Sequence, residues 1–245
     1  MKIIATIEAR MASSRLPGKI LKPILGKPTL ERLIERVKRS KLVQDIVVAT
    51  TDMVSDDETE AACKKMNVHF YRGSSEDVLD RVLKAAKAFW ADTIVELTGD
   101  CPLIDPKIID SVIQHYLDNE YDYVSNVLVR TFPRGMDTQI FSVNVLDGVD
   151  KLTQDPADRE NVSLYIYEHP EKYTLGNVTA SSDILKRPDL RLTVDTQEDF
   201  ELIHEIYTRL YPSKPDFSLS DIIQLIERTP HLKELNKHIQ QKTAR

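Results

Sequence analysis

Apolar residues follow two patterns that alternate along the chain. Short, nearly continuous apolar runs predict buried strands at residues 3–7, 45–50, 68–71, 93–97, 121–126, 136–142 and 190–195. Between these runs, apolar residues at helical spacing predict helices at residues 28–40, 56–66, 74–90, 106–117, 158–168 and 197–210. Strands that alternate with helices in this way predict an α/β fold, with a mainly parallel sheet and helices on both faces.

A single domain is expected over residues 1–245. No segment rich in proline, glycine and serine divides the chain, and no repeat is visible. The pattern is less regular between residues 121 and 180, which we interpret as a small inserted arm. Two short helices are expected after the break at residues 214–216.

The loop after the first predicted strand carries an unusual local charge. Every charged residue between positions 9 and 30 is positive, namely Arg10, Arg15, Lys19, Lys22 and Lys27. The whole chain, by contrast, has a formal net charge of −6. Arginine forks, lysine ammonium groups, the hydroxyls of Ser13 and Ser14 and the backbone N–H groups of such a loop suit a polyphosphate. The loop therefore predicts an anion-binding site.

Motifs and composition narrow the class of protein further. The chain contains neither G-x-x-x-x-G-K-[ST] nor G-x-G-x-x-G, so neither a P-loop nor a dinucleotide-binding fingerprint is present. Its acidic balance disfavours bulk binding of nucleic acid or anionic membranes. No apolar run approaches the ~20 residues of a membrane span, and the first residues do not form a signal-peptide pattern. With only two cysteines, Cys63 and Cys101, a disulfide framework is not expected. We expect a cytoplasmic protein.

Two aspartates end predicted strands, Asp100 in "LTGD" and Asp195 in "RLTVD". Ligands of open α/β sheets bind at the carboxyl ends of the strands, where the cationic loop also lies. Aspartates in these positions can cap helices, or they can hold Mg²⁺ beside a polyphosphate. Their shared edge with the cationic loop favours the metal.

Seven segments, in order, resemble one family: "ARMASSRLPGK", "VVATTD", "YRGSSEDVLDR", "TGDCPLID", "YDYVSN", "FPRGMD" and "TVDTQEDF". Together they resemble the cytidylyltransferase superfamily, the CMP-sugar-acid synthetases, and most of all its SpsF-like spore-coat polysaccharide branch. The resemblance implies a Rossmann-like sheet of the nucleotide-diphospho-sugar transferase type. It also implies that the enzyme, with Mg²⁺ as cofactor, converts CTP and a sugar acid into a CMP-sugar and pyrophosphate. The resemblance further implies a role in surface or spore-coat polysaccharide biosynthesis and a homodimer.

The resemblance also implies roles for individual residues. Arg15 and Lys19 would be catalytic, because they would neutralise the charge that grows on the leaving pyrophosphate. Asp100 and Asp195 would bind Mg²⁺. The residues expected to bind the nucleotide are Ala9, Arg10, Ser13, Ser14, Arg72, Asp80 and Arg81.

The acceptor half of the site is less strongly marked. The segment "FPRGMD" offers Arg134 to an acceptor carboxylate and Asp137 as a base or an orienting group, although an ordinary turn before a strand has the same composition. The chain departs from the SpsF-like pattern at Asn161, where histidine is usual, and at Gln139, where glutamate is usual. Two other functions stay open: a glycosyltransferase on the same kind of α/β sheet that uses a nucleotide-sugar donor, and, because of these two departures, a CTP-binding protein without catalysis.

Overall fold

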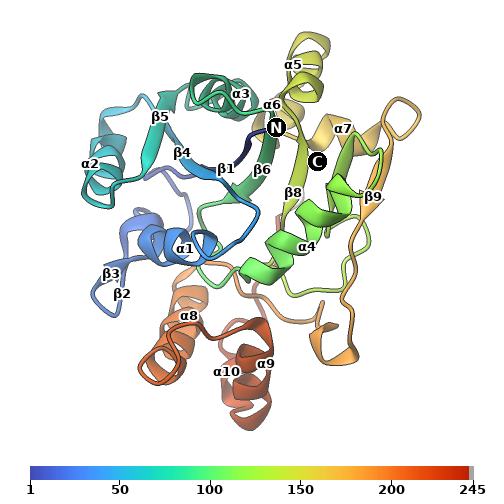
Figure 1. Cartoon of the computed structure of the whole chain (residues 1–245). Coiled ribbons are helices and arrows are strands. Elements are labelled where there is room, and N and C mark those ends of the chain that lie inside the picture. Colours follow the sequence, from blue (N-terminus) through green and yellow to red (C-terminus); the bar gives the residue numbers. More distant parts are fainter. Residues whose placement is uncertain (243–245) are drawn as a thin grey trace.

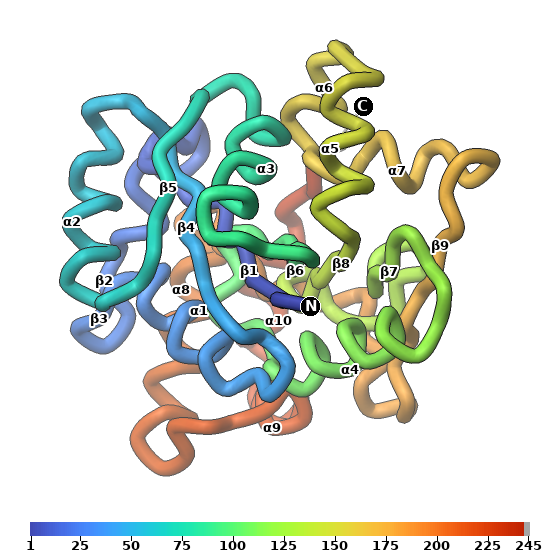
Figure 2. Tube along the Cα trace, turned by 45° about the horizontal axis from the view of Figure 1, so that its top comes forward, coloured from blue at the N-terminus to red at the C-terminus, as the bar shows by residue number. Residues whose placement is uncertain are grey.

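A seven-stranded sheet lies at the centre of the protein (Figure 1), whose computed structural model describes residues 1–242. The strand order is β5-β4-β1-β6-β8-β7-β9. The strands are β1 (Ile3–Glu8), β4 (Asp45–Thr51), β5 (His69–Gly73), β6 (Thr93–Thr98), β7 (Tyr123–Ser125), β8 (Gln139–Ser142) and β9 (Leu175–Asn177). Strands β5, β4, β1 and β6 are parallel, and β8 is antiparallel to both β6 and β7. The predicted mainly parallel sheet is confirmed, and Figure 2 shows β5, β4, β1 and β6 side by side.

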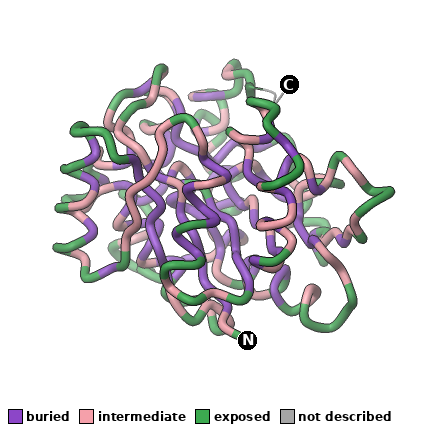
Figure 3. The backbone as a smooth tube through the Cα atoms, turned by 90° about the horizontal axis from the view of Figure 1, so that it is seen from above, coloured by how far each residue is buried: buried purple, intermediate pink, exposed green. Residues whose placement is uncertain are grey.

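Helices cover both faces of this sheet. Helices α1 (Thr29–Val37), α2 (Asp57–Lys65) and α4 (Pro106–Leu117) bury apolar side chains with one face. Helices α3 (Val78–Ala88), α5 (Val143–Leu152) and α7 (Leu164–Glu168) do so with the other. The alternation of apolar side chains along the strands explains this division, since neighbouring residues of a strand point to opposite faces. Figure 3 shows that the buried backbone is concentrated in the strands between these layers.

A third apolar cluster lies outside the sheet. It is built mainly from α8 (Gln197–Leu210), α9 (Leu219–Arg228) and α10 (His231–Glu234), which Figure 1 shows together in orange and red. The buried Arg36 side chain of α1 joins this layer to the rest of the fold, since it donates to the carbonyl oxygens of Ile104 (2.6 Å) and Phe217 (3.0 Å). The helical layer is thereby fixed beside the carboxyl edge of the sheet.

Several local predictions are wrong. The helix predicted at residues 158–168 is two short helices, α6 (Pro156–Glu160) and α7, because Val162 between them has a left-handed backbone with φ +26°. Residues 190–195 form no strand, and only an isolated bridge joins Arg191 to Arg134. Helix α5, strand β9 and the small hairpin of β2 (Pro23–Ile24) and β3 (Lys27–Pro28) were not predicted.

Residues 121–180, expected as an inserted arm, contribute β7, β8 and β9 to one end of the main sheet. This segment also exposes the adjacent apolar side chains of Leu128 and Val129, as well as Leu152. Within residues 1–242, no helix is long and apolar enough to cross a membrane.

Candidate active site

The cationic loop, residues 9–22, folds back at the carboxyl end of β1. Gly18 has φ +68°, a left-handed conformation that suits glycine, and its N–H donates to the carbonyl oxygen of Met11 at 3.0 Å. The N–H of Met11 in turn donates to the buried Asp56 carboxylate at 2.8 Å. These contacts turn the chain, so that Lys19 lies at the start of a short 3₁₀ helix and points back toward the sheet edge.

Four of the predicted site residues come together there, and we call them the Lys19 cluster: Arg15, Lys19, Asp100 and Asp195. The Lys19 Nζ atom lies 3.1 Å from Asp100 Oδ2 and 2.7 Å from Asp195 Oδ1. A guanidinium nitrogen of Arg15 lies 3.0 Å from Asp195 Oδ2. Two carboxylates from distant parts of the sequence therefore face the cationic loop.

The backbone explains how Asp100 reaches this position. Gly99, at the end of β6, donates its N–H to the carbonyl oxygen of Glu8 at 2.8 Å. A Cβ atom on Gly99 would meet that same oxygen at 2.8 Å, closer than real Cβ contacts come. Glycine before Asp100 thus lets the ends of β1 and β6 approach closely, which places the carboxylate beside the cationic loop.

Charge and burial together set the electrostatics of the cluster. Burial would lower the pKa of Lys19, but the neighbouring charges of Asp100 and Asp195 raise it above its ordinary value. Burial would raise the pKa of Asp195, but Lys19, Arg15 and Arg191 hold it below its ordinary value. The lysine stays protonated and the aspartate stays ionised at neutral pH.

The donor set of the cluster fits Mg²⁺. Because one ammonium group contacts both carboxylates, the oxygens of Asp100 and Asp195 converge on a small volume that a single cation can share. Mg²⁺ is commonly held by one or two carboxylates together with substrate phosphates and water. Within the described part of the chain, no group of three or more His, Cys, Asp and Glu side chains could hold a metal. An ion at this site would therefore need oxygens from the substrate as well.

A second group of polar residues supports Asp195 from behind. The Arg191 guanidinium donates to Asp195 Oδ2 at 2.5 Å and to Asp199 at 3.0 Å. Asp199 also accepts from the backbone N–H of Asp195 at 3.0 Å and from the Asn236 side chain at 2.8 Å. Neither Arg191 nor Asn236 was predicted as a site residue: Arg191 stands in the segment "RLTVD" with Asp195, but sequence alone does not show the two side chains in contact, and Asn236 lies about 40 residues further along the chain.

The other predicted nucleotide contacts lie apart from the Lys19 cluster or have partners within the chain. Arg10 donates to the carbonyl oxygen of Ser75 at 3.0 Å. Arg72 is engaged by Asp57 and Glu60 of α2, at 2.6 and 2.8 Å. The remaining residues are placed as follows: the Ala9 N–H donates to the Ala49 carbonyl, Ser13 accepts from the Leu16 N–H, Ser14 is exposed, Asp80 pairs with Lys84, and the buried Arg81 donates to the Ser74 carbonyl.

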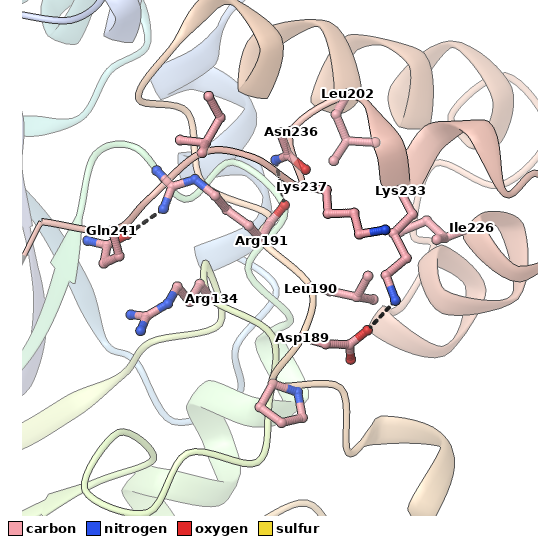
Figure 4. A pocket seen from close by; sticks show the side chains of 12 residues that line it. Arg134, Asp189, Leu190, Arg191, Leu202, Ile226, Lys233, Asn236, Lys237 and Gln241 are labelled. Carbon is pink, nitrogen blue, oxygen red and sulfur yellow. Dashed lines mark hydrogen bonds and ion pairs between the residues drawn. The ribbon is translucent and has the colours of Figure 1, made fainter.

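The predicted acceptor residues lie in a turn that packs against the segment before Asp195. Asp137 accepts two hydrogen bonds from Arg130, at 2.6 and 2.8 Å. Among residues 1–242 the Arg134 guanidinium has no hydrogen-bond or ion-pair partner, and burial together with the charges of Arg130 and Arg191 lowers its pKa. Arg134 lines a cavity of about 130 Å³ beside Arg191 (Figure 4), whose other labelled polar residues include Lys233, Asn236 and Gln241.

A buried polar layer on the α3 side of the sheet was also missed. It contains three ionisable side chains with an unpartnered buried atom within the described chain: Glu8 Oε1, Glu96 Oε2 and Arg81 Nε. Burial raises the pKa of Glu8 to about 7, and it raises the pKa of Glu96 well above its ordinary value, with the charge of Glu8 adding to the effect. Gln139, opposite Glu96 in the sheet, accepts from the hydroxyl of Tyr123 at 2.5 Å. This layer extends from Glu8, at the end of β1, to Gln139, one of the two positions at which the sequence departs from the SpsF-like pattern.

A protein family and one relative each match nearly the whole chain. The family model described as "Cytidylyltransferase" matches residues 4–243. The spore coat polysaccharide biosynthesis protein SpsF of Bacillus subtilis is 37% identical over 235 residues, which are 93% of this chain and 95% of that protein. A 3-deoxy-manno-octulosonate cytidylyltransferase of Geobacter metallireducens is 40% identical over 116 residues, 46% of this chain and 44% of that protein.

Solved structures of cytidylyltransferases resemble this fold. A cytidylyltransferase from Leptospira borgpetersenii has a TM-score of 0.90 and 37% identity, over 99% of this chain and 100% of that one. The CMP:2-keto-3-deoxy-manno-octonic acid synthetase complexed with CTP has a TM-score of 0.65 and 21% identity, over 85% of this chain and 99% of that one. The second likeness is one of fold.

Proposed function

The chain belongs to the cytidylyltransferase family and is a CTP-dependent nucleotidyltransferase, and we propose that it transfers CMP from CTP to a sugar acid or a related anionic acceptor, with Mg²⁺ as cofactor and release of pyrophosphate. The observation that supports this most directly is the Lys19 cluster. It places two carboxylates suited to Mg²⁺ against a loop whose cations suit the triphosphate.

Attack on the α-phosphorus leaves negative charge on the departing pyrophosphate, so catalysis depends on positioning and electrostatic stabilisation. We assign that stabilisation to Arg15 and Lys19, which lie together on the cationic loop. Both cations contact aspartates in the free protein, and they would exchange carboxylate oxygens for phosphate oxygens when CTP binds. Bound Mg²⁺ would supply Lewis-acid polarisation of the phosphates, held by Asp100 and Asp195.

We assign Arg134 to the carboxylate of the acceptor. Its guanidinium is the member of the "FPRGMD" segment that has no partner within residues 1–242, and a planar fork suits a carboxylate. Because both oxygens of Asp137 accept from Arg130, the orienting role suits Asp137 better than the role of base. A place in surface or spore-coat polysaccharide biosynthesis rests on the name of the Bacillus subtilis relative.

We also propose a cytoplasmic homodimer. The exposed Leu128 and Val129 side chains give residues 121–180 an apolar surface that a second copy could cover. Sedimentation of the purified protein tests this assignment, and replacement of both residues by serine should shift the equilibrium toward monomer.

The test of the proposed function combines calorimetry with a pyrophosphate assay. CTP, UTP, ATP and GTP are titrated with Mg²⁺ into the wild type, Asp100→Asn and the matched control Asp118→Asn, an exposed aspartate at the end of α4. CTP-selective binding that is lost only in Asp100→Asn, and pyrophosphate release with one of a panel of sugar acids, are expected. Equal binding of all four nucleotides would overturn the proposal.

Titration of nucleotide-sugars beside the four nucleotides separates the two alternative functions. Tight binding of an intact nucleotide-sugar without pyrophosphate release would identify a glycosyltransferase. Binding of CTP without turnover across the panel would identify a binding protein, and the double change Asn161→His and Gln139→Glu would then test whether those departures removed the activity.

A further inference from the structure

We propose that Arg191 is a positioning residue of the metal site: it fixes the carboxylate of Asp195, so that one oxygen faces Lys19 and Asp100, and it transmits this constraint from the C-terminal helical layer. The proposal rests on the assignment of Mg²⁺ to Asp100 and Asp195. Arg191 itself does not contact the Lys19 side of the carboxylate.

The contacts of Asp195 show a division between its two oxygens. Oδ1 lies 2.7 Å from Lys19 Nζ, on the side of Asp100. Oδ2 accepts from Arg191 at 2.5 Å and lies 3.0 Å from Arg15. Arg191, which makes the shorter of the two contacts with Oδ2, therefore restricts the rotation of the carboxylate and leaves Oδ1 directed at Lys19, which Asp100 also contacts.

Arg191 is in turn held rigidly. Its side chain is 7% exposed, and its guanidinium forms two hydrogen bonds with the carboxylate of Asp199, at 3.0 and 3.2 Å. A guanidinium that bridges two carboxylates has a fixed plane, since its donors diverge in a fork. The direction in which it donates to Asp195 is then fixed as well.

Asp199 connects this arrangement to the backbone. It is fully buried and sits at the third position of α8, where it forms a capping box with Thr196. It also accepts from the N–H of Asp195 at 3.0 Å. The helix start, the metal-ligand backbone and Arg191 are thus joined through one carboxylate.

Asn236, near the C-terminal end of the chain, binds both Asp199 and Arg191. Asn236, buried after α10, donates through Nδ2 to Asp199 Oδ1 at 2.8 Å and to the backbone oxygen of Arg191 at 3.0 Å. Asn236 and Arg191 both line the cavity that Arg134 lines (Figure 4). The helical layer at the C-terminal end therefore supports the metal site through hydrogen bonds rather than through apolar packing alone.

Residues that orient a metal ligand without touching the metal typically change metal affinity 10- to 100-fold when they are removed. The test measures binding of Mn²⁺ to the full chain by electron paramagnetic resonance, with a non-hydrolysable α,β-methylene CTP present. Wild type, Arg191→Gln, Arg191→Lys and Asp195→Asn are compared. The matched control is Arg187→Gln, which changes an arginine of the same segment that pairs with Asp189 and Glu227 instead.

We expect Arg191→Gln to weaken Mn²⁺ binding 10- to 100-fold, Arg191→Lys to recover part of the loss, and Arg187→Gln to bind as the wild type does. Binding of the nucleotide in EDTA should be equal in wild type and Arg191→Gln, because a merely structural defect would weaken it too. If Arg191→Gln does not fold, Asn236→Ala takes its place: weaker Mn²⁺ binding than in the wild type is then expected, and wild-type Mn²⁺ binding would overturn the proposal.

The outcomes separate this proposal from the proposed function. Loss of Mn²⁺ binding in Asp195→Asn but wild-type binding in Arg191→Gln would overturn the role of Arg191 and leave the metal site in place. Wild-type binding in Asp195→Asn would overturn the metal assignment, and the role of Arg191 with it.

Discussion

Lys19 Nζ lies 2.7 Å from Asp195 Oδ1, although the two residues are 176 positions apart in the sequence. Lys19 belongs to the loop after β1, and Asp195 directly precedes Thr196, the N-cap of α8. Neither side chain is open to solvent, with 14% and 11% of their surfaces exposed. Their ion pair therefore joins the cationic loop to the helical layer in a partly desolvated setting.

The first prediction concerns Lys19→Met. Without the ammonium group, two neighbouring carboxylates lose their shared counter-charge, so the variant should unfold at a lower temperature in EDTA. Added Mg²⁺ should raise its melting temperature more than that of the wild type. Activity should fall by about two orders of magnitude, or about 3 kcal/mol of transition-state stabilisation.

The matched control is Lys27→Met, which removes a more exposed lysine whose partners Glu31 and Glu35 lie on α1. Its melting temperature should not depend on Mg²⁺ more than that of the wild type. An equal response to Mg²⁺ in Lys19→Met and wild type, measured by calorimetry, would contradict the placement of the ion.

The second prediction concerns Glu8 and pH. Burial raises the pKa of Glu8 from 4.5 to about 7, so the folded protein holds a proton that the unfolded chain releases. The stability that this proton brings is present below pH 4.5 and is lost as the pH rises to about 7, by no more than about 3 kcal/mol. Glu8→Gln should remove this loss and be the more stable form at pH 8, as urea unfolding at several pH values would show.

A flat difference between Glu8→Gln and wild type across this pH range would show that Glu8 titrates normally. Glu76→Gln, a change at an exposed glutamate near α3, serves as the control and should leave the pH profile unchanged.

The third prediction concerns the coupling of Glu8 to Glu96. Each carboxyl group has a buried oxygen without a partner among residues 1–242, and the charge of Glu8 contributes to the raised pKa of Glu96. Replacing either residue by glutamine removes the repulsion that its charge exerts on the other carboxyl group. The double variant should therefore gain less stability at pH 8 than the sum of the two single gains, by about 0.5 kcal/mol or more. Strict additivity in urea unfolding would mean that the two carboxyl groups do not interact.

The fourth prediction uses two glycines as a matched pair. Gly135, in "FPRGMD", has φ +97°, and a Cβ there would lie 2.5 Å from the carbonyl oxygen of Leu192. Gly135→Ala should lower stability by about 3 kcal/mol or more. Gly148, within α5, has open space around it, so Gly148→Ala should raise stability by about 0.5–1 kcal/mol. Opposite signs in thermal unfolding are the expected result, and a neutral Gly135→Ala would exclude the close packing of this turn.

Much of the fold could be predicted, because the parallel strands are buried on both faces and stand out as apolar runs. The errors fall where tertiary contacts outweigh local pattern. Residues 190–195 are as apolar as a strand, yet their backbone pairs with the turn at Arg134 rather than with the sheet. Helix α5 was missed because polar residues and Gly148 interrupt its apolar pattern, although Ser142 accepts from Val145 N–H as an N-cap should.

The site divides in the same way. Arg15, Lys19 and Asp100 could be found from sequence because the loop after β1 and the end of β6 share one edge of an α/β sheet by construction. Asp195 was found with them although the strand predicted before it does not form. Arg191, Asp199 and Asn236 could not be linked to it, since their arrangement depends on how α8 and α10 pack. The buried layer around Glu96 depends on strand register, which a sequence pattern does not determine.

The 176-residue separation of Lys19 and Asp195 also bears on the order in which the chain folds. Closing a loop of that length costs roughly 5 kcal/mol of chain entropy on the logarithmic scaling, and contacts between such distant residues slow folding. We therefore expect the pair to form late, after the sheet and its helices have collapsed. Changes at Lys19 or Arg191 should then speed unfolding while they leave the refolding rate nearly constant, so that nucleotide binding is the last property a refolding molecule regains.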